Sequence, residues 1–272
     1  MNVARLLRAF GHEVQVTGFA GGIVGREMSG MLAAEGIATA FVPVSGESRL
    51  CLNFVDPETG RQTQVDEPGP TVTAAETKAL VQRWRELLAG SGLALVSGSP
   101  PPGVRAGLYA RLVRLARAAR VPVFVDARNA YLRAAADAGP DLVRVNRDEL
   151  SHLAGVPLRS WAAIVRQATE LTATRTGAVV VSWGARGAVA VTASGTWLAR
   201  SPEVTAVSAV GSGDAMLAVL AHGAVVGLSW PERLRLAVAA GAANAGTLGA
   251  CLIGPEEVHG LVEKVDCEPL RA

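Results

Sequence analysis

The sequence predicts an α/β fold: a doubly wound, mostly parallel sheet that carries a small antiparallel β lid. Segments with helical and with strand-like patterns alternate along most of the chain. The strand-like runs at 123–126 (Val-Phe-Val-Asp) and 179–182 (Val-Val-Val-Ser) are apolar almost throughout. Such runs are typical of parallel strands that helices cover on both faces. By contrast, three short alternating segments follow one another at 38–67 without a helix between them, which predicts the lid.

The elements follow in order from the periodicity of the apolar residues. Before the break at Pro68-Gly69-Pro70, the pattern predicts helices at 2–10 and 26–35 and strands at 13–19, 38–44, 50–56 and 62–67. After the break, it predicts helices at 74–88, 105–119, 147–154, 160–174, 214–226, 230–248 and 255–265. The strands of this second part are expected at 93–97, 121–126, 141–145, 178–183, 188–192 and 196–200.

Length and composition favour one domain over residues 1–272, with the lid at 38–67 inserted in it. Half of the 272 residues are hydrophobic, and the formal charge is only +2 with scattered basic residues, so no nucleic-acid partner is indicated. No run reaches the ~18 apolar residues of a membrane span. Cys51, Cys251 and Cys267 lack a paired spacing, which predicts reduced thiols and a cytoplasmic protein.

The strongest chemical signal is the turn Gly211-Ser212-Gly213 followed by Asp214 and an apolar helical run. A helix start presents unsatisfied N–H groups and a partial positive charge, so it can seat an anion. A carboxylate in its first turn could take a proton from a hydroxyl group beside that anion. The combination indicates phosphoryl transfer, although an ordinary glycine turn with an N-capping Asp explains the same residues.

Three further polar clusters end predicted strands, where ligands of such sheets bind. Residues 97–103 (Ser-Gly-Ser-Pro-Pro-Pro-Gly) form a rigid turn with free hydroxyl groups. Asn146 and Glu149 would share one side of a helix start and could hold a hydrated Mg²⁺ through oxygen atoms. Residues 184–188 (Gly-Ala-Arg-Gly-Ala) form a turn that could approach a nucleotide. A strand-to-helix loop, a capped helix and a hairpin turn remain the respective alternatives.

The order of these motifs resembles that of the ribokinase-like (PfkB) carbohydrate kinases. The residues that carry the resemblance are Asn-Val-Ala-Arg at 2–5, the turn at 97–103, Asn-Arg-Asp-Glu at 146–149, Ser-Trp-Gly-Ala-Arg-Gly-Ala at 182–188 and Gly-Ser-Gly-Asp at 211–214. In addition, Asp-Glu-Pro-Gly-Pro at 66–70 is similar to a motif of the 1-phosphofructokinase branch. The resemblance covers essentially the whole chain and implies a ribokinase-like fold.

The resemblance also implies roles for individual residues. Asp214 would be the catalytic base, and Gly211, Ser212 and Gly213 would form the anion hole for the transferred phosphoryl group. Mg²⁺ would be organised through water by Asn146 and Glu149, and ATP would be bound by Ser182, Gly184, Gly187 and Asn244. The sugar phosphate would be contacted by Asn2, Ser99 and Arg49, whose guanidinium fork suits a phosphate. A second copy of the chain is the other expected partner, in a homodimer formed through the β lid.

The implied activity is ATP-dependent phosphorylation of a sugar phosphate, with fructose 1-phosphate as the expected substrate and fructose 1,6-bisphosphate as the product. Tagatose 6-phosphate, fructose 6-phosphate or an unphosphorylated sugar are alternatives in the same class. The chain departs from the family pattern at its start, because Met1-Asn2 lies inside the first motif. A preceding segment with the first core strand, two lid strands and a Gly-Gly-Lys-Gly turn is expected in the family. If that segment is truly lost, an exposed strand edge and a truncated, non-catalytic nucleotide-binding relative are expected.

Overall fold

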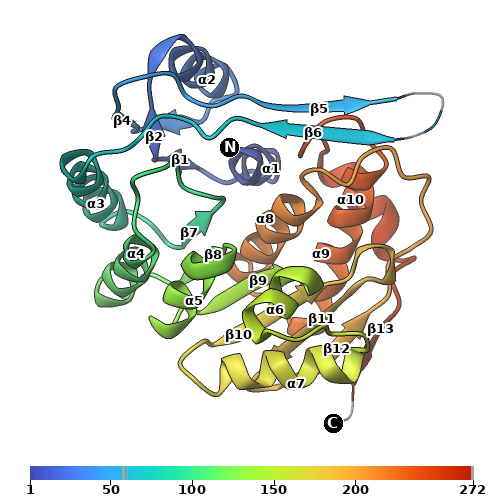
Figure 1. The fold of residues 1–272 in the computed structure, drawn as a ribbon. Coiled ribbons are helices and arrows are strands. Elements are labelled where there is room, and N and C mark those ends of the chain that lie inside the picture. The colour runs from blue at the N-terminus through green and yellow to red at the C-terminus, as the bar shows by residue number, and fades with distance from the viewer. Residues whose placement is uncertain (57–58, 60, 271–272) are drawn as a thin grey trace.

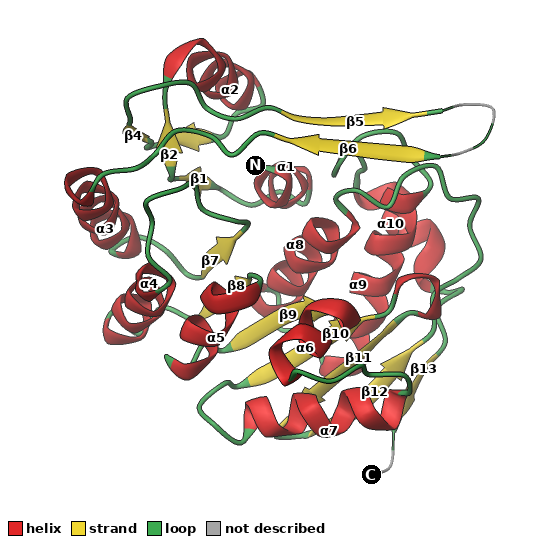
Figure 2. Cartoon of the chain, viewed as in Figure 1, coloured by secondary structure: helices red, strands yellow, loops and turns green. Residues whose placement is uncertain are grey.

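The centre of the molecule is a seven-stranded mixed sheet (Figure 1, Figure 2). The computed structural model describes the whole chain except residues 57–58, 60 and 271–272. In spatial order the sheet contains β13 (Cys267–Pro269), β12 (Gly195–Ala199), β11 (Ala188–Thr192), β10 (Ala178–Ser182), β9 (Leu142–Asn146), β8 (Val123–Asp126) and β7 (Ala94–Ser97). Strands β7 to β10 run parallel, whereas β10 to β13 pair antiparallel. The predicted α/β class is confirmed.

Helices cover both faces of this sheet, as the doubly wound class requires. Successive side chains of a strand point to opposite faces, so Val179 and Val181 enter one core while Val180 enters the other. The first core also receives α3 (Ala74–Leu88), α4 (Gly107–Ala118), α5 (Asn129–Asp137), α6 (Arg147–Ala154) and α7 (Trp161–Thr172). The second core receives α1 (Asn2–Ala9), α8 (Ser212–Val225), α9 (Trp230–Ala245) and α10 (Pro255–Val262).

The first strands of the chain form a separate unit outside the seven-stranded sheet. It consists of β1 (Gln15–Val16), β2 (Phe19–Ala20), α2 (Gly22–Ala34), β3 (Ala38–Thr39) and β4 (Val42–Pro43). β3 pairs parallel with β1, and β4 pairs parallel with β2. The prediction that 38–44 belongs to an antiparallel lid is therefore wrong. The segment pairs with β1 and β2 because Ile37 is buried with Leu32 in a small core, which holds the segment against α2 and β1.

The lid itself is the antiparallel hairpin of β5 (Cys51–Val55) and β6 (Gln62–Asp66). It extends over the body of the molecule toward the loop that precedes α8 (Figure 1). Gln62 donates a hydrogen bond from Nε2 to the Val207 carbonyl oxygen (2.7 Å), and Asn53 donates one to the Ser208 hydroxyl (3.4 Å). The lid thus contacts the segment that leads into the Gly211–Asp214 turn.

Two elements, α5 and β13, were not expected from the periodicity. The turn before β11 contains a short 3₁₀ helix, η1 (Gly184–Arg186). Over the described part of the chain, no helix combines the length and the apolar character needed to cross a membrane.

Candidate functional site

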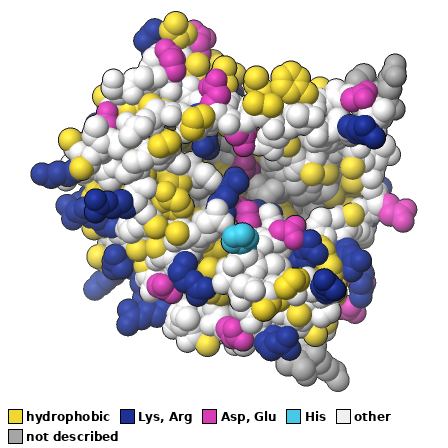
Figure 3. Space-filling view, viewed as in Figure 1, with side chains coloured by type: hydrophobic (Ala, Val, Ile, Leu, Met, Phe, Trp, Pro, Cys, Tyr) yellow, Lys and Arg dark blue, Asp and Glu magenta, His cyan; other side chains and the backbone are white. Residues whose placement is uncertain are grey.

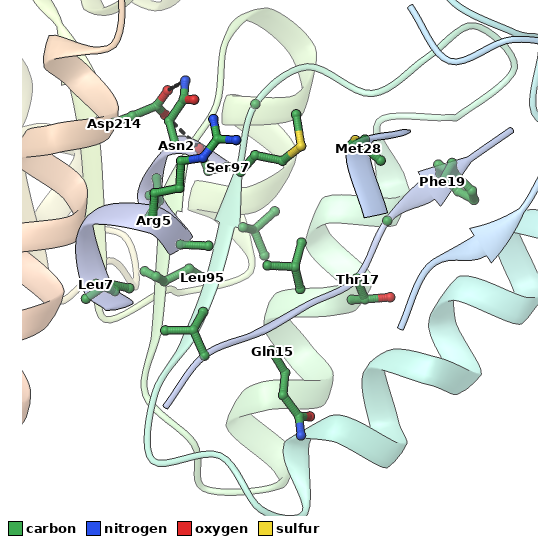
Figure 4. Close-up of a pocket in the computed structure, with 18 of the residues that line it drawn as sticks. Asn2, Arg5, Leu7, Gln15, Thr17, Phe19, Met28, Leu95, Ser97 and Asp214 are labelled. Atoms are coloured by element: carbon green, nitrogen blue, oxygen red, sulfur yellow. Dashed lines mark hydrogen bonds between the residues drawn. The ribbon is translucent and has the colours of Figure 1, made fainter. Parts of the chain in front are cut away.

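The carboxylate of Asp214 lies where three distant parts of the chain meet. It stands in the first turn of α8, which begins after Gly211 with a backbone φ of +86°. Asn2, at the start of α1, donates a hydrogen bond from Nδ2 to Oδ2 of Asp214 (2.8 Å). Ser97, at the end of β7, donates one from its hydroxyl to Oδ1 (3.3 Å) (Figure 4). Both donors fix the orientation of the carboxylate.

The glycine turn before Asp214 is held in its conformation by the buried side-chain amide of Asn244. Asn244 is fully buried and donates from Nδ2 to the Val210 carbonyl oxygen (2.9 Å) and to the Ser212 hydroxyl (3.2 Å). Its Oδ1 accepts the N–H of Cys251 (2.7 Å). In this conformation the Asn244 amide has no exposed surface toward a nucleotide. Its hydrogen bonds support the turn.

Of the amides in this turn, that of Ser212 already donates to the Ala209 carbonyl oxygen (3.2 Å). The N–H of Gly213 has no backbone acceptor among the described residues, as expected for the first turn of a helix. The Arg144 guanidinium lies directly against Gly213, since a Cβ added there would fall 2.3 Å from its Nη1. A positive charge therefore stands beside the free N–H group, and both favour an anion at this point.

Arg144 belongs to a buried polar network that joins the ends of β8, β9 and β10. Its Nη1 donates to Oδ2 of Asp126 (3.0 Å), and its Nη2 donates to the Ser182 hydroxyl (2.7 Å). The pKa of Asp126 is raised to about 6, chiefly by burial and also by the charges of Glu149 and Asp214, while Arg144 opposes the rise. The charges of two further carboxylates thus act on Asp126, whose one ion-pair partner among the described residues is Arg144, so negative charge gathers around Asp126.

Asn146 and Glu149 form a capping box at the start of α6. Oδ1 of Asn146 accepts the N–H of Glu149 (2.8 Å), and Oε2 of Glu149 accepts the N–H of Asn146 (2.8 Å). The capped-helix alternative for this spacing is therefore confirmed. The oxygen donors and the excess negative charge around Asp126 also fit a divalent cation, which binds carboxylate and amide oxygens. The two interpretations are compatible when the cation is bound through water.

The predicted nucleotide residues follow β10 in one continuous turn. Ser182 is buried and bound to Arg144, whereas Gly184 has open space where a side chain would stand. Gly187 lies against the Ala199 carbonyl oxygen of β12, with no room for a Cβ between them. Its close approach keeps the β11–β12 hairpin tight, so Gly184 is the more accessible glycine of this turn.

The predicted sugar-phosphate residues line a common cavity of about 1730 Å³ together with Asp214. Arg49 donates from Nη2 to the Ser99 carbonyl oxygen (3.2 Å), and the Ser99 hydroxyl is buried without a partner among the described residues. Figure 3 shows the molecular surface hollowed below the lid, with acidic and basic side chains meeting at the hollow. The structure thus brings Asn2, Arg49 and Ser99 to the Asp214 side of the cavity.

Sequence reasoning missed the roles of Asp126, Arg144 and Ser97 at this site. The signal for Asp126 and Arg144 was present, because each charged residue lies in an otherwise apolar strand (Val-Phe-Val-Asp and Leu-Val-Arg-Val-Asn). A buried charge requires a partner, and adjacent parallel strands supply it here. The contact between Ser97 and Asp214 depends on the tertiary fold, so no local pattern could reveal it.

These features are those of an enzyme site in which a helix N-terminus that favours an anion lies beside a carboxylate. The family model of the pfkB family carbohydrate kinases matches residues 1–257. The 1-phosphofructokinase of Rhodobacter capsulatus is 35% identical over 99% of this chain and 86% of its own length. The ATP-dependent 6-phosphofructokinase isozyme 2 of Mycobacterium tuberculosis is 31% identical over 97% of this chain and 78% of its own length.

Among solved structures, phosphofructokinase-2 from Escherichia coli superposes with a TM-score of 0.90 and 29% identity, covering 96% of this chain and 85% of that one. The chain therefore belongs to the pfkB family of carbohydrate kinases. It has the ribokinase-like fold that the order of motifs implied, and it is a phosphotransferase enzyme. The family's chemistry takes the phosphoryl group from ATP.

Proposed function

We propose that this chain transfers the γ-phosphoryl group of ATP to a hydroxyl group of a sugar phosphate. Fructose 1-phosphate is the substrate that we favour, and fructose 1,6-bisphosphate is then the product. The observation that carries the proposal is the position of Asp214. It faces the cavity on one side and stands next to the free N–H of Gly213 on the other.

In the proposed reaction, Asp214 accepts the proton of the sugar hydroxyl as the hydroxyl oxygen attacks the γ-phosphorus atom. The bond between that phosphorus and the β–γ bridging oxygen breaks, and ADP leaves with the bond's electrons. Asn2 and Ser97 hold the carboxylate in place. The Gly213 amide and the Arg144 guanidinium offset the charge on the transferred group, because phosphoryl transfer depends chiefly on positioning and charge neutralisation.

Mg²⁺ would be held through water by Asn146 and Glu149, with Asp126 close to both. When bound, the cation neutralises phosphate charge and orients the phosphate chain. The open side of Gly184 leaves space for the nucleotide, and the buried Ser182 fixes the end of β10 beneath it. In this proposal the nucleotide lies on the β9–β10 side of Asp214 and the sugar on the β7 side.

Arg49 is proposed to read the phosphate already present on the sugar. Its guanidinium lies at the lid base and donates one hydrogen bond to the Ser99 carbonyl oxygen, which directs it at the turn that follows β7. Guanidinium groups bind phosphate oxygens in pairs. Specificity for a phosphorylated sugar over a neutral one follows from that charge.

The test of the catalytic assignment is Asp214→Asn, with Glu256→Gln as the matched control. Glu256 is also a first-turn carboxylate, on α10, but it is exposed. We expect a loss of roughly 10²–10⁴-fold in kcat for Asp214→Asn, the usual contribution of a general base, with ATP affinity retained. Turnover in Asp214→Asn equal to that of Glu256→Gln would refute the assignment.

The substrate is decided by a coupled assay of ADP release with four acceptors: fructose 1-phosphate, fructose 6-phosphate, tagatose 6-phosphate and fructose. The proposal requires the highest kcat/KM for fructose 1-phosphate. Saturable ATP binding without transfer to any of the four acceptors would instead support the alternative of a non-catalytic nucleotide-binding relative.

We also propose that two copies associate through the lid. Leu52, Phe54 and Val65 share one face of the β5–β6 hairpin and are each about half exposed. Asn53 and Gln62, on the opposite face, contact the body of the molecule. The apolar face is thus turned away from the body, and a second hairpin with the same face would cover it.

A further inference from the structure

Asn244, near the end of α9, has no exposed surface, the lowest value among the buried polar residues of the described chain. The segment that leads into the glycine turn is attached to the same helix end. The N–H groups of Val207 and Ser208 donate to the Ala245 carbonyl oxygen (2.7 and 3.1 Å). A polar side chain that is buried this deeply requires a partner for each polar atom, and the partners of Asn244 lie on two other segments of the chain.

The side-chain amide of Asn244 uses its donors and its acceptor in opposite directions. Nδ2 donates to the Val210 carbonyl oxygen (2.9 Å) and to the Ser212 hydroxyl (3.2 Å), whereas Oδ1 accepts the N–H of Cys251 (2.7 Å). The side chain at this position must therefore donate twice and accept once. Only the amides of Asn and Gln can do so, and close packing disfavours the longer Gln.

The contacts with the turn fix the peptide groups on both sides of Gly211. The Val210 carbonyl belongs to the peptide group before Gly211, and Asn244 binds it. The Ser212 N–H belongs to the peptide group after Gly211, and it donates to a carbonyl oxygen of the same turn (3.2 Å). Gly211 itself has a φ of +86°, and a Cβ there would lie 2.5 Å from the Cβ of Ala250 and 3.3 Å from Oδ1 of Asn244. The turn is thus confined from the side of Asn244.

Asn244 also holds the loop that packs on the turn. Cys251 in this loop has a φ of +55°, in the left-handed region that residues other than glycine seldom adopt. Such a conformation persists only where the surrounding contacts fix it. Here Asn244 accepts the Cys251 N–H, and the Cys251 thiol donates to the Gly211 carbonyl oxygen (3.7 Å). One side-chain amide therefore connects a strained loop to the glycine turn.

The next amide along the chain is that of Gly213, which has no backbone acceptor among the described residues. Because it follows directly on the fixed peptide groups around Gly211, its direction depends on them. A donor stabilises developing charge most when its direction is set before the reaction. Misplacement by about 1 Å can reduce a rate by about 10²-fold, even when the substituted residue is remote from the reacting atoms.

We propose that Asn244 is a positioning residue for phosphoryl transfer, which acts through the glycine turn and contacts neither ATP nor the sugar. Its amide holds residues 210–213 so that the Gly213 N–H is directed at the phosphoryl group beside Asp214. This role rests on the proposed function, and it replaces the nucleotide contact that the order of motifs implied for Asn244.

The first test is Asn244→Leu, which keeps a similar shape and removes every polar atom of the side chain. The matched control is Thr176→Val, because Thr176 is also buried and its hydroxyl donates to the Ala136 carbonyl oxygen (3.4 Å), near the start of β10 and away from the turn. We expect kcat of Asn244→Leu to fall by about 10²-fold with little change in either KM. Thr176→Val should keep the wild-type kcat. A wild-type kcat in Asn244→Leu would overturn the role.

The second test is Asn244→Asp, which makes the donor titratable. A protonated carboxyl group can donate one hydrogen bond, whereas an ionised one only accepts. The ratio of its kcat to that of the wild type should therefore rise as the pH falls from 8.5 to 6, with an unchanged KM for ATP. A merely structural defect would alter the folded fraction, followed by circular dichroism, but not kcat per folded molecule. A ratio independent of pH would contradict the positioning role, as would a pH-dependent ratio combined with a wild-type kcat in Asn244→Leu, which would assign the effect to the introduced charge.

Amide hydrogen exchange separates the positioning role from the proposed function. The N–H groups of Ser212 and Ala215 donate to carbonyl oxygens within the turn (3.2 and 2.8 Å). In Asn244→Leu we expect both to exchange at least about tenfold faster than in the wild type, with no change in Thr176→Val. If the wild type phosphorylated none of the acceptors, the proposed function would fail while this difference in exchange remained. Unchanged exchange at Ser212 and Ala215 would refute the role of Asn244 even in an active kinase.

Discussion

Replacing Arg144 by methionine tests whether the charge of Arg144 stabilises the buried network next to the glycine turn. The side-chain volume is largely kept, while the only guanidinium that contacts Asp126 in the described structure is lost. Even with Arg144 present, burial raises the pKa of Asp126 from 3.8 to about 6. At 1.36 kcal/mol per pKa unit, the ionised carboxylate already costs about 3 kcal/mol in the native state.

Removing one partner of a buried ion pair typically destabilises a protein by about 3–5 kcal/mol, because the remaining charge is uncompensated. For Arg144→Met we expect a loss of this size in the free energy of unfolding at pH 8, where Asp126 is ionised. At pH 5 the native Asp126 is largely protonated in both proteins, so the loss should be clearly smaller.

The sign of the pH effect follows from proton binding. Because the pKa of Asp126 is higher in the folded than in the unfolded state, the native state binds more protons between pH 3.8 and about 6. Stability from this group is therefore lost as the pH rises through that window. Without Arg144, which lowers the pKa of Asp126, the window should extend to higher pH.

The measurement is urea unfolding of the wild type and of Arg144→Met at pH 5 and pH 8. The double variant Arg144→Met, Asp126→Asn is the control, and it should recover most of the loss at pH 8 because no buried charge remains. Equal destabilisation at both pH values, or a double variant less stable than the single one, would refute the reasoning. Either result would show that packing around Arg144, rather than its charge, dominates.

Three further variants test neighbouring features. Asn2→Ala removes a hydrogen bond to the Asp214 carboxylate. If Asp214 is the base, we expect kcat to fall by roughly tenfold or more with little change in the KM for ATP, measured by steady-state kinetics. Burial, with the charges of His12 and His259, lowers the pKa of His222. His222 therefore binds fewer protons in the folded than in the unfolded protein below pH 6.5, so the free energy of unfolding decreases as the pH falls through that value. His222→Gln should reduce this pH dependence in thermal unfolding at pH 5.5 and 7.5. Phe54→Asp should convert a lid-mediated dimer to a monomer in analytical ultracentrifugation, and an unchanged mass would exclude that interface.

Local patterns were sufficient for the elements whose signals are strong. The mainly apolar strands β8 and β10 lie where the pattern predicted them, because strands buried on both faces are apolar along nearly their whole length. The cap at Asn146 was equally visible, since a capping box involves residues only three positions apart.

The rest could not be predicted from periodicity because tertiary contacts decide it. Residues 38–44 alternate like a lid strand, yet the burial of Ile37 and pairing with 15–20 place them in a parallel ladder. Asn244 was expected at the nucleotide, but the polypeptide around Val210 and Cys251 encloses its amide. In both cases the residue type fitted two environments, and only the packing of distant segments distinguished them.

The site joins two halves of different origin in the chain. The α8 turn and the ends of β8, β9 and β10 form a network of direct hydrogen bonds around Arg144, so this half is fixed by buried contacts. The half proposed to bind the sugar depends on α1, β7 and the lid base, which meet around the cavity through fewer polar contacts, such as Asn2–Asp214 and Arg49–Ser99. If the proposed roles hold, a substitution that loosens these few contacts should raise the KM for the sugar phosphate before it changes ATP affinity.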